Sequence, residues 1–593
     1  MRLRTTRLYM RRQIRRQRRR LEEVSRHTGE LFEKDFLGRL GRLKAVWRFT
    51  LVWVLLFVLL GGCLVTQLTA LRSYYQVISP VPGGIYSEGM EGSFTTANPL
   101  YAVSDIDTSV AKLLFSSLLT YDSQNHLTGD LADRWTVNDA GTIYTVHLRP
   151  NLVWHDGRPL TADDVVFTYQ TIQNPDAQSP LRSSWQNVSV TAINNRTVSF
   201  TLPNPLSSFP YSLTNGIVPK HILQAINVAD LRSTSFNTAD PIGAGPFRWG
   251  SLGQSGGDPA TTEEQISLVP FAQYWAGAPK LSSFSIHAFA SHEAMLKAYR
   301  DRAITALVGL DSAPADIAKD NSTYIYNLPL TAAVFTFFKT SNPILQDPKV
   351  RQALVWAADR GSAIQRLDYP AIPADEPLLR GQLGYDRAYI QTTNKPSQAR
   401  ALLDSDGWSV GVNGIRTKNG QPLTFALYET NDSEYARIAT LLRNQWRDIG
   451  VDVKVVPQQP ADFQGTLSSH AYDAVLYGVS IGVDPDVFVY WDSSQADIRS
   501  ANRLNFSEYK STTADVALEA GRTRLDSQLR AVKYKTFLQA WQQDVPALAL
   551  YQPRLLYISH VQVHGLGENQ INTDADRYNN VQDWMIHTGW VTR

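Results

Sequence analysis

The residues that most suggest reactive chemistry are Gly478-Val479-Ser480-Ile481-Gly482, which match the pattern Gly-x-Ser-x-Gly. In serine hydrolases this pattern forms a sharp turn that exposes a nucleophilic serine between a strand and a helix. A strand-like segment from Ala474 to Tyr477 precedes it, and three histidines follow it, His560, His564 and His587. The turn must lead directly into a helix, however, and Val483-Asp484-Pro485-Asp486 is a poor helix start. We therefore do not expect a nucleophile elbow here, and a serine hydrolase that uses Ser480 is the remote alternative.

Metal and nucleotide chemistry have little support elsewhere in the sequence. His292-Glu293-Ala294-Met295-Leu296 begins like a zinc-protease helix, but leucine replaces the second histidine, so no zinc pair forms. His155 and Asp156 precede an aspartate pair at 163–164, yet turn and helix-capping roles account for all four. The 593 residues contain no Gly-Lys-Ser/Thr phosphate loop, so the chain cannot itself be an ATPase. We expect no enzyme activity, no metal and no cofactor.

The N-terminal part combines a basic tail with an apolar segment. Residues 1–48 carry 16 Lys and Arg against 5 Asp and Glu, whereas the rest of the chain is acidic overall. The 23 residues from Phe49 to Leu71 lack any charge, and a helix of that length crosses a bilayer core. The arginines before this segment place the N-terminus in the cytoplasm and residues 80–593 outside. Nucleic-acid binding by the tail is an alternative, but no binding module accompanies it.

Cys63 is the only cysteine, so no disulfide can form within the chain. Leu60-Gly61-Gly62-Cys63 approximates a lipoprotein cleavage box, in which the cysteine would be acylated. Two features favour an uncleaved anchor instead. The segment before the box is far longer than that of a secretory signal, and apolar residues continue past Cys63 to Leu71.

Beyond a Pro- and Gly-rich linker at 79–84, strand-like and helix-like patterns alternate, which predicts an α/β architecture. The predicted strands are 188–193, 197–202, 423–428, 451–456 and 474–477. The predicted helices are 109–119, 350–358, 435–449 and 531–543.

The segment from Leu148 to Phe167 is predicted to have a structural role and no direct part in ligand binding. Ile143 to Leu148 is rich in β-branched and aromatic residues, as a half-buried strand should be. The following Trp154-His155-Asp156-Gly157-Arg158-Pro159 has the composition of a turn. Thr161 then predicts a helix N-cap, with Asp164 completing a capping pair.

These residues, with Gly129 to Trp135 before them, resemble the signature of extracytoplasmic solute-binding protein family 5, the peptide- and oligopeptide-binding components of ABC importers. Further motifs of that family follow in order along the chain. They are Asn98-Pro99, Pro241 to Phe247, Asp347 to Leu354 with Ala358 to Arg360, Ala401 to Leu403 with Gly407-Trp408, Trp446 to Val451, and Asp544 to Ala547.

The resemblance implies an α/β fold with two lobes and three subdomains, of the periplasmic-binding type for peptides, preceded by one transmembrane helix. The expected parts are a basic cytoplasmic tail (1–48), a transmembrane anchor (49–71), a linker (72–85), lobe I with an inserted subdomain (86–290, completed by 549–593) and lobe II (291–548). It also implies a non-enzymatic function. The protein would capture peptides outside the plasma membrane and deliver them to an ABC permease with its ATPase subunits.

Peptide binders of this family often hold the ligand termini with charges, an acid for the amine and an arginine for the carboxylate. In this chain the position of the acid, three residues before Asp484-Pro485, is occupied by Ile481. The loop in which relatives carry the arginine has the sequence Glu429-Thr430-Asn431-Asp432, and Arg437 already lies in the predicted helix that follows. Because an unpaired buried charge costs several kcal/mol, a dipeptide held by its two ends is disfavoured. A longer peptide held by its backbone remains open, as does a cationic or uncharged solute approached by Asp105, Glu429, Asp484 or Asp486.

The predicted ligand-binding residues lie where the chain departs from its relatives. They are Val103, Ser104, Asp105, Glu429, Thr430, Asn431, Gly478, Val479, Ser480 and Ile481. Tyr490-Trp491 is a weaker candidate for contact with a ligand side chain. A membrane-tethered solute sensor is a further alternative, although no cytoplasmic enzyme domain supports it.

Overall fold

The computed structural model describes residues 47–256, 262–497, 499–500, 503–567 and 569–592. They form two compact units, one made of the N-terminal segment up to Ser79 with Thr588–Arg593, and the other made of Pro80–His587. The basic tail predicted over 1–48 lies outside the described residues, except for its last two.

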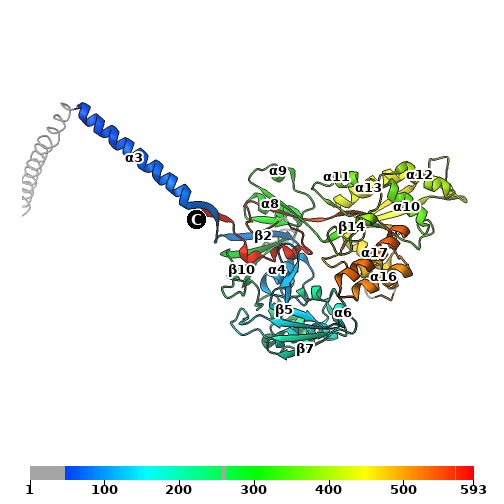
Figure 1. Cartoon of the computed structure of the whole chain (residues 1–593), viewed down its shortest axis with the longest axis horizontal. Coiled ribbons are helices and arrows are strands. Elements are labelled where there is room, and N and C mark those ends of the chain that lie inside the picture. Colours follow the sequence, from blue (N-terminus) through cyan, green and yellow to red (C-terminus); the bar gives the residue numbers. More distant parts are fainter. Residues whose placement is uncertain (1–46, 257–261, 498, 501–502, 568, 593) are drawn as a thin grey trace, which may run out of the picture. The chain divides into compact units, whose positions relative to one another are not determined.

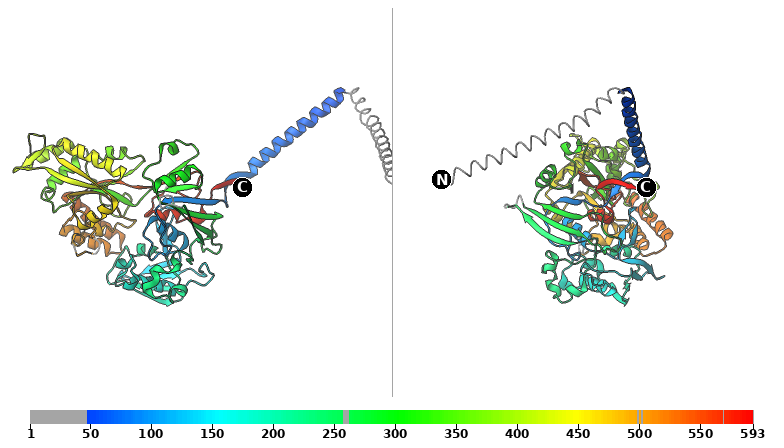
Figure 2. Two further views of the ribbon diagram at one scale, coloured as in Figure 1. Left: turned by 180° about the vertical axis from the view of Figure 1, so that it is seen from behind. Right: turned by 90° about the vertical axis from the view of Figure 1, so that its left-hand side faces the viewer.

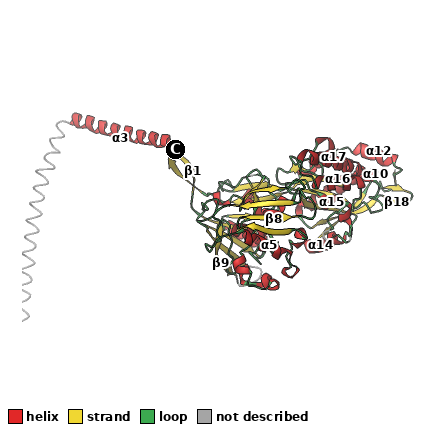
Figure 3. Cartoon of the chain, turned by 60° about the horizontal axis from the view of Figure 1, so that its bottom comes forward, coloured by secondary structure: helices red, strands yellow, loops and turns green. Residues whose placement is uncertain are grey.

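The N-terminal unit contains one long helix and most of a two-stranded sheet. Helix α3 (Trp47–Tyr75) is continuous, as Figure 3 shows, and the only described helix long and apolar enough to cross a membrane is its stretch Trp47–Thr69. The segment predicted as a linker instead continues α3 and then forms strand β1 (Gln76–Val81), which pairs with β24 (His587–Thr592).

A mixed seven-stranded sheet forms the first half of the larger unit. Its strands lie in the order β13 (Tyr324–Pro329), β23 (Arg554–Ser559), β12 (Ala306–Val308), β2 (Ile85–Glu91), β11 (Ser283–Phe289), β10 (Glu263–Pro270), β9 (Phe247–Ser255). Helix α4 (Asp105–Leu114) packs in the main core on one face, and α8 (His292–Arg300) and α9 (Ala315–Ala318) contribute to a smaller cluster with β23 and β12.

An inserted group of strands and helices separates β2 from β9 in sequence, and it is cyan in both views of Figure 2. Its sheet has the order β5 (Ala132–Val137), β6 (Ile143–Leu148), β8 (Thr197–Thr201), β7 (Ser189–Asn194), and all its neighbours are antiparallel. It also contains the hairpin β3–β4 (Leu119–Tyr121 and Leu127–Gly129) and the helices α5 (Ala162–Gln173), α6 (Arg182–Trp185) and α7 (Lys220–Leu223).

A six-stranded sheet organises the other half of the larger unit. Its order is β15 (Ile372–Pro373), β22 (Ala547–Gln552), β14 (Ala332–Phe338), β21 (Ala474–Ser480), β19 (Thr424–Thr430), β20 (Asp452–Gln458). Every residue of β14 is buried, because helices cover both faces of the sheet, and its near-continuous apolar sequence fits that position.

Two helical layers cover the six-stranded sheet, above and below β14 in Figure 1. The first layer holds α10 (Pro348–Ala357), α11 (Arg360–Gln365), α12 (Pro396–Ser405) and α13 (Ser433–Asp448). The second holds α14 (Pro460–Ser469), α15 (Phe488–Trp491), α16 (Thr512–Arg522) and α17 (Ser527–Asp544). A small three-stranded sheet lies beyond α12, with β16 (Ser409–Val410), β17 (Arg416–Lys418) and β18 (Gln421–Pro422).

Strand pairing divides the chain at other points than the expected lobe boundaries. β12 and β13 pair in the seven-stranded sheet although they follow residue 290, and β22 belongs entirely to the six-stranded sheet although it passes residue 548. The chain therefore crosses between the sheets at residues 330–331 and again at Pro553. Sequence patterns define single strands, whereas sheet membership depends on partners that are distant in sequence.

Local signals of the scaffold segment are confirmed. Strand β6 has the predicted bounds, and the Thr161 N–H donates to Asp164 Oδ2 at 2.8 Å in a capping box. His155 is buried, with its ring nitrogens 3.1 Å from Gly245 O and 3.2 Å from Gly243 N, and burial lowers its pKa to about 4. The prediction of a helix over 109–119 was wrong at both ends, since α4 begins at Asp105 and ends at Leu114, and residue 119 starts β3.

Candidate functional site

The carboxyl ends of β19 and β21 lie beside residues 330–331, where the chain crosses into the six-stranded sheet. Parallel strands present their carboxyl ends at one edge, and β14 begins at that edge with Ala332 opposite Ser480. The N–H groups of Ile481 and Gly482 both donate to the carbonyl of Thr331, at 2.8 and 2.9 Å. The predicted segments 429–431 and 478–481 therefore lie together, on adjacent strands beside the crossing.

β21 extends beyond its neighbour β19. The two strands pair only at Leu427 with Ala474 and at Tyr428 with Val475, whereas β14 pairs with β21 as far as Ser480. Among the described strands, residues 476–480 of β21 thus have a ladder partner on one side only. The other side is an open backbone edge, and open edges of this kind accept an added strand.

Two tyrosine side chains approach this open edge. The Tyr435 hydroxyl, from the first turn of α13, hydrogen-bonds the backbone of Gly478, and a Cβ on Gly478 would lie 2.8 Å from it. The Tyr490 hydroxyl donates to Ser480 O at 2.6 Å. Val479 and Ile481 are buried in the core, so only the backbone of Val479 could contact a ligand, and the same holds for Ile481.

Glu429 is the most unusual charged residue at this edge. Its side chain is only 1% exposed, and its Oε2 has no hydrogen-bond partner in the described structure. Burial and the neighbouring carboxylate of Asp432 raise the pKa of Glu429 to about 7. A buried acceptor without a donor is costly, which makes it a candidate site for a donor that a ligand brings.

The rest of the loop before α13 is held by its own hydrogen bonds. The N–H of Asn431 donates to Gln458 O at 2.7 Å, and the Asp432 carboxylate caps α13 by accepting from the Glu434 N–H at 2.6 Å. Asn431 is exposed, and Thr430 is the last residue of β19. Arg437 lies within α13 and pairs with Asp368 at 3.1 Å, so the loop itself offers no cation.

The predicted residues Val103, Ser104 and Asp105 stand at the start of α4, on the side of the seven-stranded sheet. Ser104 caps the helix by accepting from the Asp107 N–H at 3.1 Å, and Val103 is 70% exposed. No hydrogen bond or ion pair of the described chain joins these three residues to 429–431 or 478–481. Their role in the site therefore remains a prediction.

Asp484 and Asp486 have partners within the protein. Asp484 forms a buried ion pair with Arg530 at 2.7 Å. Asp486 accepts a hydrogen bond from Ser208 Oγ at 2.8 Å and lies 3.3 Å from Arg522. Of these contacts, only the hydrogen bond from Ser208 joins the inserted group to the half with the six-stranded sheet. Trp491, 1% exposed, is a core residue, so only Tyr490 of the predicted aromatic pair faces the open edge.

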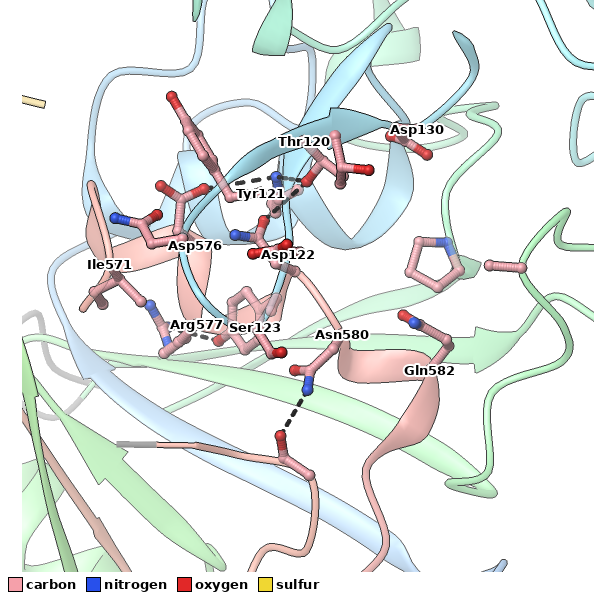
Figure 4. Close-up of a pocket in the computed structure, with 18 of the residues that line it drawn as sticks. Thr120, Tyr121, Asp122, Ser123, Asp130, Ile571, Asp576, Arg577, Asn580 and Gln582 are labelled. Atoms are coloured by element: carbon pink, nitrogen blue, oxygen red, sulfur yellow. Dashed lines mark hydrogen bonds and ion pairs between the residues drawn. The ribbon is translucent and has the colours of Figure 1, made fainter. Parts of the chain in front are cut away.

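A cavity of about 360 Å³ lies between the β3–β4 hairpin and the C-terminal segment 565–582 (Figure 4). Charges in its wall pair with one another, as in Lys112 with Asp576 at 3.6 Å, and Asn580 donates to Gly565 O at 2.6 Å. The Thr331 N–H donates to Ile571 O, which ties this wall to the crossing. The cavity has no local sequence signature, because its two walls are over 400 residues apart in the chain.

The geometry after Ser480 differs from that of a hydrolase elbow. β21 is followed by an irregular stretch, and the next helix, α15, begins only at Phe488. His560 belongs to the other half, where its Nε2 hydrogen-bonds Tyr299 O at 2.8 Å and its ring stacks on Tyr299. Ser480 is therefore not held on the strand-to-helix turn that nucleophile activation requires.

Comparisons with known proteins identify the family. The profile of bacterial extracellular solute-binding proteins, family 5, matches residues 126–500. The chain belongs to this family. It is 26% identical over 562 residues to the oligopeptide-binding protein AppA of Bacillus subtilis, covering 92% of this chain and 99% of the relative.

Solved structures agree with this assignment. AppA of Bacillus subtilis in complex with a nonapeptide superposes with a TM-score of 0.67 at 25% identity, over 86% of this chain and 100% of that one. NikZ of Campylobacter jejuni in complex with Ni(L-His) gives 0.69 at 26% identity, over 84% and 99%. The fold is therefore the two-lobed α/β fold of family 5, whose members bind solutes and are not enzymes.

Proposed function

We propose that this protein captures peptides outside the membrane and delivers them to an ABC importer permease. The domain after residue 80 is an extracytoplasmic solute-binding domain of family 5. Relatives named as oligopeptide-binding proteins motivate the choice of ligand, whereas the nickel–histidine complex of NikZ marks a small non-peptide solute as the alternative.

The observation that carries the proposal is the open edge of β21. Residues 476–480 are in extended conformation and pair with β14 on one side; on the other side no described strand pairs with them, and the Tyr490 hydroxyl donates to Ser480 O. A peptide laid along that edge adds a strand, and its main-chain hydrogen bonds supply affinity without reading sequence. This mode does not need a pair of terminal charges, which agrees with the apolar Ile481 at the position where relatives place an acid. It favours peptides of several residues over dipeptides.

We further propose that α3 remains uncleaved and anchors the protein in the plasma membrane, with its basic tail in the cytoplasm. The side chains of the apolar stretch Trp47–Thr69 are not buried inside the protein. A lipid bilayer is therefore the environment that would remove these apolar side chains from water. The permease and its ATPase subunits supply the energy, because the chain lacks a phosphate loop.

Native mass spectrometry and thermal unfolding of the detergent-solubilised full chain test this function. Incubation with a mixed nonapeptide library should give peptide adducts and a Tm that rises with library concentration, as mass action requires. The peptide assignment fails if adducts form only with small non-peptide solutes such as a nickel–histidine complex.

A further inference from the structure

The open edge of β21 is bounded at one end by β19. A strand added beside residues 478–480 would lie in line with β19, because the parallel register brings Thr430, the last residue of β19, level with Tyr477. The end of such a strand nearest to β19 would meet residues 430–432, where the chain turns into α13. Whatever chemical group the solute carries at that end lies next to this turn.

Carboxylates dominate this turn. Glu429 is the penultimate residue of β19, and Asp432 interacts electrostatically with it. Asp432 also interacts with Asp311, which follows β12 in the other half of the domain. Acids from both halves therefore approach this turn, and Arg437 and Arg554 also act on Asp311. No Lys or Arg shares a hydrogen bond or ion pair with Glu429 in the described chain.

Most neighbouring charges already have partners, although Nε and Nη1 of the Arg554 guanidinium have none in the described structure. Glu434 accepts a hydrogen bond from the Tyr551 hydroxyl at 2.7 Å, and Arg437 pairs with Asp368. The Arg554 guanidinium lies 4.1 Å from the centre of the Tyr369 ring and donates to the carbonyl of Asp311 at 3.0 Å. Glu429, by contrast, is buried with its Oε2 unpartnered.

We propose that the solute carries an organic cation, an ammonium or guanidinium, at the end nearest to β19, and that Glu429 binds it. The proposal rests on the proposed function, because it assumes that the solute lies along the open edge. A cation there supplies the donor that Glu429 Oε2 lacks, and it offsets the repulsion among the acids. A carboxylate at the same end would instead be repelled by Glu429 and Asp432, neither of which forms an ion pair with a Lys or Arg in the described chain.

For a peptide with a free amine and neutral side chains, this fixes the direction of binding. The amino terminus lies at the end of β19, and the peptide runs parallel to β21, since β19 and β21 are parallel. This is the reverse of the charge arrangement in relatives that hold the amine near the position of Ile481. A basic side chain near the same end is the second possible source of the cation.

Matched peptide libraries separate these sources. The detergent-solubilised full chain is titrated with a nonapeptide library of neutral residues bearing a free amine, with the same library N-acetylated, and with an acetylated library that contains one lysine. We expect the free-amine library to bind at least about tenfold more tightly than the acetylated one. Recovery of affinity by the lysine library would assign the cation to a side chain.

Two variants test whether the tighter binding of cationic peptides depends on Glu429. In Glu429→Gln the advantage of the free amine or lysine should vanish, while binding of the neutral acetylated library is retained. Glu376→Gln is the matched control, because Glu376 is also fully buried with an unpartnered Oε2 but follows β15, at the opposite edge of the same sheet. It should keep the advantage.

The outcomes are distinct. Equal binding of all three libraries to the unmodified chain overturns the cation proposal and leaves peptide capture standing. A charge preference that persists in Glu429→Gln also overturns it. Failure of every library to bind overturns the proposed function, and with it the inference that depends on it.

Discussion

The Ile481 N–H donates to the Thr331 carbonyl at 2.8 Å, and this contact fixes the end of β21 to the crossing between the two sheets. The Thr331 N–H in turn donates to Ile571 O at 2.8 Å. One residue of the crossing thus joins the open edge of β21 to the wall of the cavity beside the β3–β4 hairpin. Rotation between the lobes, the usual motion of two-lobed binding proteins, would pivot close to the proposed peptide edge.

Gly478→Ala should weaken peptide binding about tenfold, at a stability cost of about 1 kcal/mol. The new Cβ would lie 2.8 Å from the Tyr435 hydroxyl, so Tyr435 must shift from its place beside the open edge. Peptide affinity by calorimetry and urea unfolding measure the two effects.

Tyr435→Phe provides the control, since it removes the oxygen that the added methyl group would meet. Combined with Gly478→Ala, it should restore most of the affinity. If the double variant binds no better than Gly478→Ala alone, the tyrosine does not mediate the loss.

Local sequence signals predicted the strands and caps well, because each depends on residues within a few positions. Strand β6 and the Thr161–Asp164 box are examples. The site was predicted only in part. The two segments 429–431 and 478–481 were predicted through their departure from relatives, and the structure places them on adjacent strands, while their contact with a ligand stays a prediction. The pairing of Asp484 with Arg530, 46 residues away, has no local signature. The same is true of β12 and β13, whose sheet is set by their contacts with β2 and β23.

The pH dependence of stability should report on Glu429. Its folded pKa of about 7 is above the ordinary value of 4.5, so folding favours the protonated form. The contribution to stability is fully present below about pH 4.5 and is lost as pH rises through 7. Without ligand, Tm should therefore fall between pH 5 and 8 by more in the unmodified chain than in Glu429→Gln.

Binding of a cationic peptide should show the opposite trend, because only the ionised carboxylate attracts it. The affinity for the free-amine library should rise from pH 5 to about pH 7, where the α-amine is still protonated, and the neutral acetylated library should show no such rise. Parallel pH profiles for both libraries would contradict this assignment.

Breaking the ion pair between Asp484 and Arg530 should be strongly destabilising. Asp484→Ala leaves a guanidinium buried without its counter-charge, and loss of one partner of such a pair costs about 3–5 kcal/mol. Chemical denaturation measures the change. The exposed pair of Asp497 with Arg499, 2.6 Å apart, is the control, and Asp497→Asn should cause no measurable loss.

Replacing both members of the buried pair, as in Asp484→Asn with Arg530→Met, should recover a large part of the stability, because no charge then remains buried. A loss in Asp484→Ala no greater than in Asp497→Asn would show that the pair is effectively solvated.

Removal of α3 should convert a membrane protein into a soluble one. Residues 80–593 contain the whole compact unit Pro80–His587, whereas α3 exposes apolar side chains along its length, among them Phe57, Val58 and Leu59. We expect the full chain to sediment with membranes and require detergent, and the fragment to be monodisperse without it.

The anchor itself is tested by mass. An intact chain that retains α3 supports the uncleaved anchor, whereas a mature chain that starts at an acylated Cys63 would replace it by a lipid. The fragment 80–587, which ends with the compact unit and lacks most of β24, is the matched control for folding. It should unfold at the same temperature as 80–593, because β24 pairs with β1 and with no other strand of the described structure.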